Sequence, residues 1–187
     1  KPHSVGGSEQ VVRAIDELLS RSGKSPDISS LVDGESLRPE SWLFGRSVQT
    51  TFIQKLRWGV NNVHNYLPIL PLAIEQLDLS DYPLIISSSH LVAKGVLTSP
   101  DQLHISYVHT PVRYAWDQMH IYLKRSSLVR GLFGPLIRWN LHSLRQWDQL
   151  TGLRVNKLIA NSRFTSRRIA RYWGRESEVV HPPVHVE

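Results

Sequence analysis

The chain has 187 residues, 41% of them hydrophobic and 20% charged, with a formal net charge of +6. This composition excludes an intrinsically disordered chain and is sufficient for a globular domain with a core of its own. The sequence has no cysteine, which excludes disulfides and thiolate metal sites, and no apolar run approaches the ~18 residues that a membrane-spanning helix needs.

The first part of the chain is predicted to open with a helix over residues 6–20, where apolar residues recur at helical spacing after Ser8 as a plausible N-cap. The elements expected next are strands over residues 27–32 and 47–53 and a helical stretch over residues 60–76 that Pro68 and Pro71 interrupt. A strand normally precedes a glycine pair that opens a helix. Only five residues precede Gly6, so this strand is expected to be missing from this chain.

The second part alternates short apolar strands with helices. Strands are expected over residues 82–89, 103–109, 156–160 and 178–181, and helices over residues 114–125, 134–150 and 163–173. Near-continuous apolar strands separated by helices are typical of a parallel sheet covered on both faces. The sequence therefore predicts an α/β fold, a single Rossmann-like domain over residues 1–187.

Polar residues or glycines lie at the ends of the strands of the second part and of the missing first strand, where open α/β sheets bind their ligands. These residues are Gly6, Gly7, Ser87, Ser88, Ser89, His109, Thr110, Asn161, Ser162 and His181. Because the carboxyl ends of parallel strands share one edge, we expect these groups to lie along a common crevice.

His109 is the leading candidate for chemistry at this edge. It lies five residues after His104 on the same strand, so the two rings point to opposite faces and cannot share a metal ion. The residues that follow it are suited to stacking on a sugar ring or to binding hydroxyls and phosphates: Thr110, Arg113, Tyr114, Trp116 and Asp117. The alternatives are a structural histidine and aromatic rings that pack in the core.

Two further features point to an anionic ligand. Gly6 and Gly7 allow a close approach of the backbone at a helix N-terminus, although a plain tight turn is the alternative. Asn161 and Ser162 precede the last helix, and at least one of them is expected to be its N-cap. Dinucleotide and phosphate-loop glycine motifs are missing, and the serines before His90 lack the glycines of a nucleophile elbow.

Taken together, these segments resemble the N-terminal domain of family 4 glycosyltransferases of the GT-B fold, above all enzymes of bacterial surface-polysaccharide assembly, many of them mannosyltransferases. The matching segments are GGSEQVV, LPLAIEQLDLSDYPLIISSSHLVAKGV, HISYVHTPVRYAWD, LRQWD and LIANSRFTSRRIARYWGRESEVVHPPV. The HTPVRYAWD and ANSRFTSRRI strings are the most specific, and the match spans nearly the full chain.

The resemblance implies a retaining enzyme of two Rossmann-like domains, with this chain on the acceptor side. Gly6 and Gly7 would contact the diphosphate of a nucleotide-sugar donor such as GDP-mannose, and His109 would lie beside the transferred sugar. The acceptor would be a saccharide or a lipid-linked saccharide, with neither a metal nor another cofactor. The Glu-x7-Glu signature of the family belongs to a donor-binding domain that this chain lacks, so the chain alone is expected to be inactive.

The positive charge is concentrated in residues 113–175, which contain 13 Lys and Arg residues against Asp117 and Asp148, while the rest carries 9 basic and 14 acidic residues. This asymmetry indicates an anionic partner, unless it marks only a solvated, arginine-rich surface. Together with Leu132, Phe133, Trp139 and Trp147, it predicts a cytoplasmic protein attached to the cytoplasmic face of a membrane. Packing between helices is the alternative there.

A non-catalytic nucleic-acid-binding module is the competing hypothesis for the whole chain. The basic segment with its interleaved aromatic residues suggests it, but no recognised nucleic-acid-binding motif is present. It also leaves the polar residues at the strand ends unexplained, so no nucleic-acid partner is expected.

Overall fold

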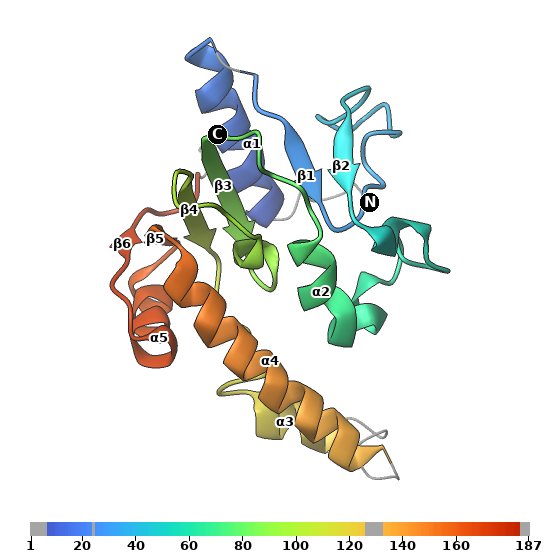
Figure 1. The fold of residues 1–187 in the computed structure, drawn as a ribbon, viewed down its shortest axis with the longest axis vertical. Helices are drawn as coiled ribbons and strands as arrows, with labels where there is room; N and C mark the ends of the chain where they lie inside the picture. Colours follow the sequence, from blue (N-terminus) through green and yellow to red (C-terminus); the bar gives the residue numbers. More distant parts are fainter. Residues whose placement is uncertain (1–6, 24, 126–132, 184–187) are drawn as a thin grey trace. The chain divides into compact units, whose positions relative to one another are not determined.

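The computed structural model describes residues 7–23, 25–125 and 133–183 (Figure 1). The chain forms two compact units. The first unit comprises Lys1–Asp78 with His181–Glu187, and the second comprises Leu79–Val180. The single domain expected over residues 1–187 stays a prediction.

The first unit contains the expected opening helix and a pair of short strands. Its elements are α1 (Gly7–Arg21), β1 (Ile28–Ser30), β2 (Val48–Thr50), the 3₁₀ helices η1 (Phe52–Lys55) and η2 (Val63–Ile69), and α2 (Leu70–Glu75). Strands β1 and β2 are parallel, with Ser29 opposite Gln49. The two prolines act as expected, because Pro68 lies inside η2 and Pro71 lies in the first turn of α2.

Strand β2 is shorter than predicted because Thr51 ends it. The Thr51 hydroxyl donates a hydrogen bond to the carbonyl of Leu31 (2.8 Å) and accepts one from the Ile53 amide (3.3 Å), which caps η1. A side chain that caps a helix turns the chain out of the extended conformation. The predicted strand over residues 47–53 therefore gives way to a 3₁₀ turn after Thr50.

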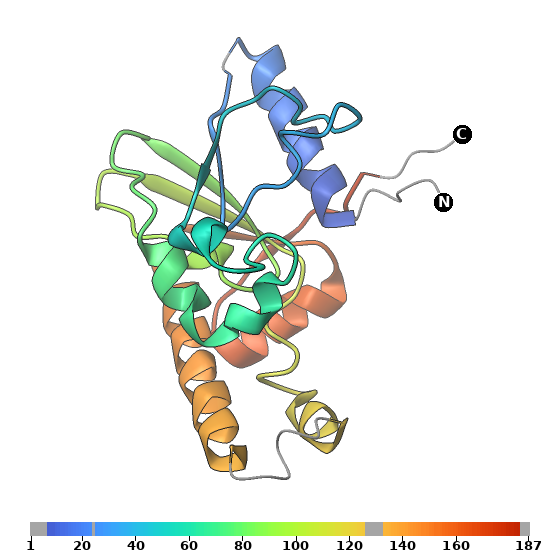
Figure 2. The same cartoon turned by 90° about the vertical axis from the view of Figure 1, so that its right-hand side faces the viewer.

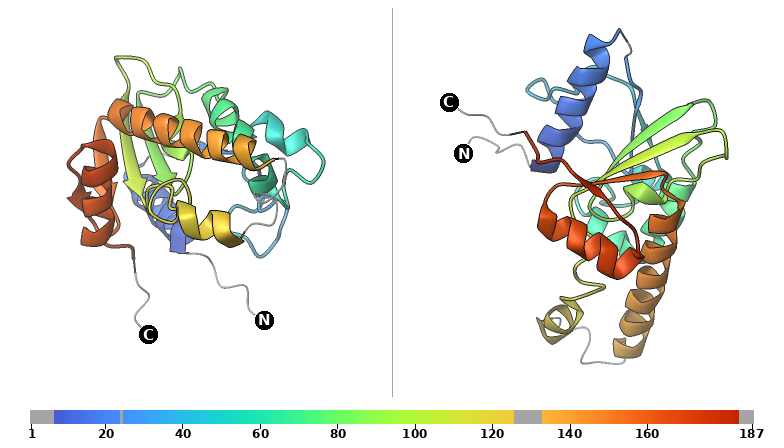
Figure 3. Two further views of the ribbon diagram at one scale, coloured as in Figure 1. Left: turned by 90° about the horizontal axis from the view of Figure 1, so that it is seen from below. Right: turned by 90° about the vertical axis from the view of Figure 1, so that its left-hand side faces the viewer.

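The second unit is built on a four-stranded parallel sheet with the order β3-β4-β5-β6 (Figures 2 and 3). Its elements are β3 (Leu84–Ser89), η3 (Ala93–Gly95), β4 (Leu103–Val108), α3 (Met119–Arg125), α4 (Gly134–Arg154), β5 (Lys157–Ala160), α5 (Arg163–Trp173) and β6 (Glu178–Val179). Helices connect β4 to β5 and β5 to β6. Parallel strands flanked by helices confirm the predicted α/β, Rossmann-like fold.

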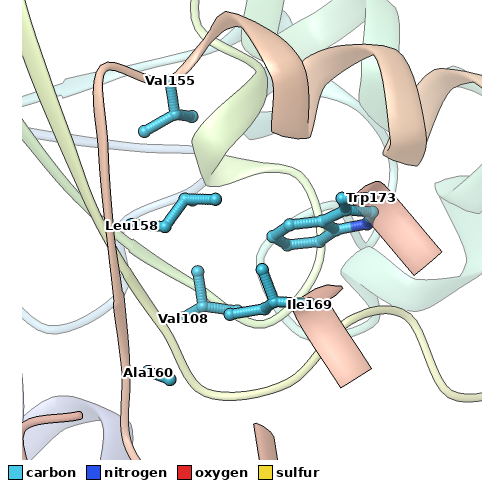
Figure 4. Close-up of a cluster of buried hydrophobic side chains, with 6 residues drawn as sticks. All are labelled: Val108, Val155, Leu158, Ala160, Ile169 and Trp173. Atoms are coloured by element: carbon cyan, nitrogen blue, oxygen red, sulfur yellow. The ribbon is translucent and has the colours of Figure 1, made fainter. Parts of the chain in front are cut away.

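A compact hydrophobic cluster attaches α5 to this sheet (Figure 4). Its buried members are Val108, Val155, Leu158, Ala160, Ile169 and Trp173. Leu158 and Ala160 alternate with more exposed residues along β5, as the period of two of a strand requires. The cluster thereby holds the second half of α5 against the sheet, next to the end of β4.

Two glycines let aromatic rings approach the backbone around α4. A Cβ atom at Gly95 would lie 2.2 Å from the Trp147 ring, and one at Gly152 would lie 2.7 Å from the Trp173 ring. Any larger residue would push these rings away. Gly152 thus permits close packing of α4 on α5.

The helix predicted over residues 114–125 is wrong for its first five residues, since α3 begins only at Met119. The preceding residues form turns in which the amides of Ala115 and Met119 bond to the carbonyls of Val112 and Trp116 (both 3.2 Å). The Trp116 side chain bonds to α4, which fixes this segment in a conformation that helical periodicity does not reveal.

Candidate functional site

Ser88 and His109 meet at the carboxyl edge of the sheet, as expected. The His109 amide donates to the carbonyl of Ser89 (2.8 Å), which continues the ladder between β3 and β4 by one residue. Its ring nitrogen Nε2 lies 2.8 Å from the Ser88 hydroxyl oxygen, a hydrogen bond whose direction depends on the tautomer. The backbone and the side chain of His109 are therefore both held by β3.

Two aromatic neighbours surround the His109 ring. The Tyr107 ring centroid lies 5.3 Å away in an edge-on arrangement, and that of His90 lies 6.5 Å away. His109 is half-buried, and burial, followed by the charge of His90, lowers its pKa from the ordinary value. The neutral form of the ring, which can both donate and accept a hydrogen bond, is therefore favoured.

His90 was missed by the sequence reasoning. The signal was present, because His90 directly follows the serines at the end of β3. The serines themselves were expected at the ligand-binding edge, but no pattern placed His90 near His109. Strand β3 thus contributes Ser88 to this edge, and the residue directly after it contributes a second imidazole.

The N-terminus of α5 lies at the same edge. Ser162 is its N-cap, accepting a hydrogen bond from the Thr165 amide (3.2 Å), which confirms the predicted capping role. The Thr165 hydroxyl in turn donates to the carbonyl of His109 (3.1 Å), and the Asn161 amide donates to the carbonyl of Val108 (3.2 Å). The start of α5 is thus attached directly to the end of β4.

Three of the predicted strand-end groups therefore meet within the second unit: Ser88, His109 and the pair Asn161–Ser162. Gly6 lies outside the described residues. Gly7 is the first residue of α1 and is exposed, and it belongs to the first unit, as does His181. Convergence of the glycines and His181 on this edge stays a prediction.

The residues after His109 differ in their surroundings. Thr110 is half-buried, its hydroxyl donating to the carbonyl of Pro111 (3.0 Å), and Arg113 is exposed. Tyr114 is half-buried with its ring centroid 5.7 Å from that of Tyr122, and burial raises its pKa. Their predicted contacts with an acceptor stay predictions.

Trp116 and Asp117 are engaged with the helices that follow. The Trp116 ring stacks on Tyr172, with 4.5 Å between centroids and 10° between planes. Asp117 pairs with Arg168 at 2.9 Å. Trp116 therefore packs as the alternative in the sequence analysis anticipated for at least one aromatic residue.

A buried polar cluster around Asp148, which the sequence did not predict, holds this segment against α4. The Asp148 carboxylate accepts hydrogen bonds from the Lys94 ammonium (2.6 Å) and from the indole N–H groups of Trp116 and Trp173 (both 2.8 Å). Both ionic side chains are 1% exposed. Burial lowers the pKa of Lys94, which Asp148 opposes. We call Lys94, Trp116, Asp148 and Trp173 the Asp148 cluster.

His104 has a separate, structural environment. Its Nε2 lies 2.9 Å from the Ser87 hydroxyl, its amide donates to the Asn156 side chain (2.8 Å), and the residue is buried. Ser87 and Ser88 are adjacent on β3, so the two histidines bond to opposite faces of the sheet, as predicted. Burial, followed by the charge of Arg154, lowers the pKa of His104 to about 4.

Comparisons of the chain with protein-family models, with curated proteins and with solved structures return no match. Across the described ranges, no three His, Asp or Glu side chains are grouped so that they could hold a metal ion. Nor does any helix in those ranges combine the length and apolar character needed to cross a membrane. The family resemblance therefore rests on the sequence motifs.

Proposed function

We propose that this chain is the acceptor-side domain of a retaining glycosyltransferase. The enzyme would move a sugar from a nucleotide-sugar donor, such as GDP-mannose, to a saccharide or lipid-linked saccharide. The observation that carries the proposal is the arrangement at His109. The half-buried imidazole of His109 is held by Ser88, and the backbone carbonyl of the same residue accepts a hydrogen bond from Thr165 at the capped N-terminus of α5.

In the proposed reaction, His109 hydrogen-bonds the sugar as it is transferred. Its Nε2 is committed to Ser88, which leaves Nδ1 for a sugar hydroxyl. A neutral ring adds no positive charge beside an oxocarbenium-like transition state, whereas an imidazolium would repel it. The lowered pKa of His109 is therefore the property that this role requires.

The start of α5 would assist with the negative charge of the leaving diphosphate. A helix N-terminus carries roughly half a positive charge, and it favours an anion by about 0.3–1 kcal/mol. Arg163, the first residue of α5, is exposed beside it. The family resemblance assigns contact with the diphosphate to the backbone amides of Gly6 and Gly7 as well, and it implies neither a metal nor another cofactor.

The Asp148 cluster would position the segment that carries the acceptor-binding residues. Trp116 bonds to Asp148 and Asp117 bonds to Arg168. These contacts anchor the far end of the Thr110–Asp117 segment to α4 and α5. Thr110, Arg113 and Tyr114 lie between this anchor and His109, which makes them the proposed acceptor contacts.

A donor screen tests the proposal. The enzyme that pairs this chain with a donor-binding domain is incubated with a panel of nucleotide sugars and saccharide acceptors, and nucleoside diphosphate release is followed. Release that depends on both one donor and an acceptor supports the proposal. The absence of release across the panel, together with tight, salt-sensitive binding of the chain to oligonucleotides, would favour the nucleic-acid-binding alternative instead.

A further inference from the structure

Large apolar side chains are exposed on α3 and around the start of α4. We call Ile121, Tyr122, Phe133, Leu136 and Trp139 the apolar tip. The last three are 64%, 60% and 65% exposed. Figures 1 and 2 place α3 near the N-terminal end of α4, at the end of the second unit away from its sheet. Arg145 of α4 connects this helix to the start of α3. Its guanidinium donates to the carbonyl of Ala115, just before α3, and to the sulfur of Met119, the first residue of α3 (both 2.9 Å).

The sequence around the apolar tip is strongly positive. Residues 118–147 contain five Lys and Arg residues and no Asp or Glu. Lys124 on α3 and Arg138 on α4 are both exposed. A surface that combines apolar side chains with charge of one sign complements a negatively charged, partly apolar partner.

Packing within the protein buries some apolar side chains of the predicted membrane segment, but it does not bury those of the apolar tip. Leu141, Leu144, Asp148, Thr151 and Gly152 are buried on one side of α4, and at 100° per residue Leu136 and Trp139 lie toward the opposite side. Trp147, named with the membrane segment, is half-buried and follows the packing alternative. Its ring packs under Lys94, whose Nζ lies 5.1 Å from the ring centroid, and fills the space beside Gly95. Leu132 lies outside the described residues.

We propose that the apolar tip docks on an anionic lipid surface. The aromatic and aliphatic side chains enter the headgroup region, while Lys124 and Arg138 pair with lipid phosphates. Aliphatic residues such as Leu136 and Ile121 favour acyl chains over nucleic-acid bases, which stack on aromatic rings. The uniform positive charge disfavours a second copy of this chain as the partner. The inference does not depend on the proposed chemistry.

Sedimentation of the full 187-residue chain with lipid vesicles tests the proposal. One set contains phosphatidylcholine alone, and the other contains phosphatidylcholine and phosphatidylglycerol in equal parts. We expect binding to the mixed vesicles that weakens as salt is added, and much weaker binding to the neutral ones. Trp139→Ala should lower the partition coefficient on mixed vesicles by about tenfold, and Arg138→Glu by a similar factor.

Leu153→Ala is the matched control. Leu153 is also exposed on α4, at 50%, but lies at the opposite end of the helix, beside the sheet. Its substitution should leave the partition coefficient unchanged. The proposal is overturned if the chain does not bind mixed vesicles at low salt, or if Trp139→Ala leaves binding unchanged. It is also overturned if Leu153→Ala weakens binding as much as Trp139→Ala, or if the chain prefers oligonucleotides to vesicles.

Discussion

Replacing Asp148 by asparagine removes the charge that compensates Lys94 while keeping the shape of the side chain. Both side chains are 1% exposed, and loss of one partner of a buried ion pair costs about 3–5 kcal/mol. Lys94 can avoid being an unpaired buried charge by releasing its proton. In the unfolded chain Lys94 has an ordinary lysine pKa and is protonated at pH 7. Keeping it neutral in the folded chain therefore costs about 5 kcal/mol, because each pH unit below that pKa costs about 1.4 kcal/mol.

The same arithmetic predicts a dependence on pH. In the variant, burial lowers the pKa of Lys94 without opposition from Asp148. The unfolded chain then binds a proton that the folded chain lacks, so stability rises with pH up to the ordinary lysine pKa. At pH 9 a neutral Lys94 costs only about 2 kcal/mol, and the deficit of Asp148→Asn relative to the wild type should shrink accordingly.

Urea denaturation followed by far-ultraviolet circular dichroism at pH 7 and pH 9 measures both effects. Glu17→Gln is the control, because Glu17 forms an exposed pair with Arg13 on α1 and its loss should cost at most about 0.5 kcal/mol. A deficit below about 1 kcal/mol for Asp148→Asn at pH 7 would refute the reasoning. So would a deficit that does not shrink with rising pH.

Three further changes have defined outcomes. The lowered pKa of His104, about 4, means that stability should fall by roughly 2 kcal/mol as pH drops from 8 to 5, and thermal melts of His104→Gln should show a flatter pH dependence. Gly152→Ala should cost about 1–3 kcal/mol in urea denaturation, because its Cβ would lie 2.7 Å from the Trp173 ring. Ser162→Ala should cost about 1 kcal/mol in the same assay, since the Thr165 amide loses its capping partner.

Local patterns predicted most of the α/β fold. Helix α5 begins and ends where the sequence indicated, because Ser162 caps it and Gly174 adopts the left-handed conformation (φ 65°) that ends it. The late start of α3 was not predictable in the same way. It depends on the bond from Trp116 to Asp148 on α4, and no periodicity within residues 114–125 encodes such a contact.

The contacts of the candidate site were likewise only partly predictable from the sequence. The partnership of Ser88 with His109 follows from parallel strands in register, since both residues lie at strand ends. The proximity of His90 and the Asp148 cluster could not be inferred. Lys94 and Asp148 are 54 residues apart, and an isolated lysine and aspartate in a sequence are most often solvated. Only the packing of α4 against η3 brings them together.

Turnover of the His109→Ala variant tests the proposed function most directly. It is measured in the enzyme that pairs this chain with a donor-binding domain, with His142→Ala, an exposed histidine on α4, as the control. We predict that His109→Ala lowers kcat by about 100-fold or more with little change in melting temperature, and that His142→Ala leaves both kcat and the melting temperature unchanged. Near-normal kcat for His109→Ala would contradict the role assigned to this imidazole.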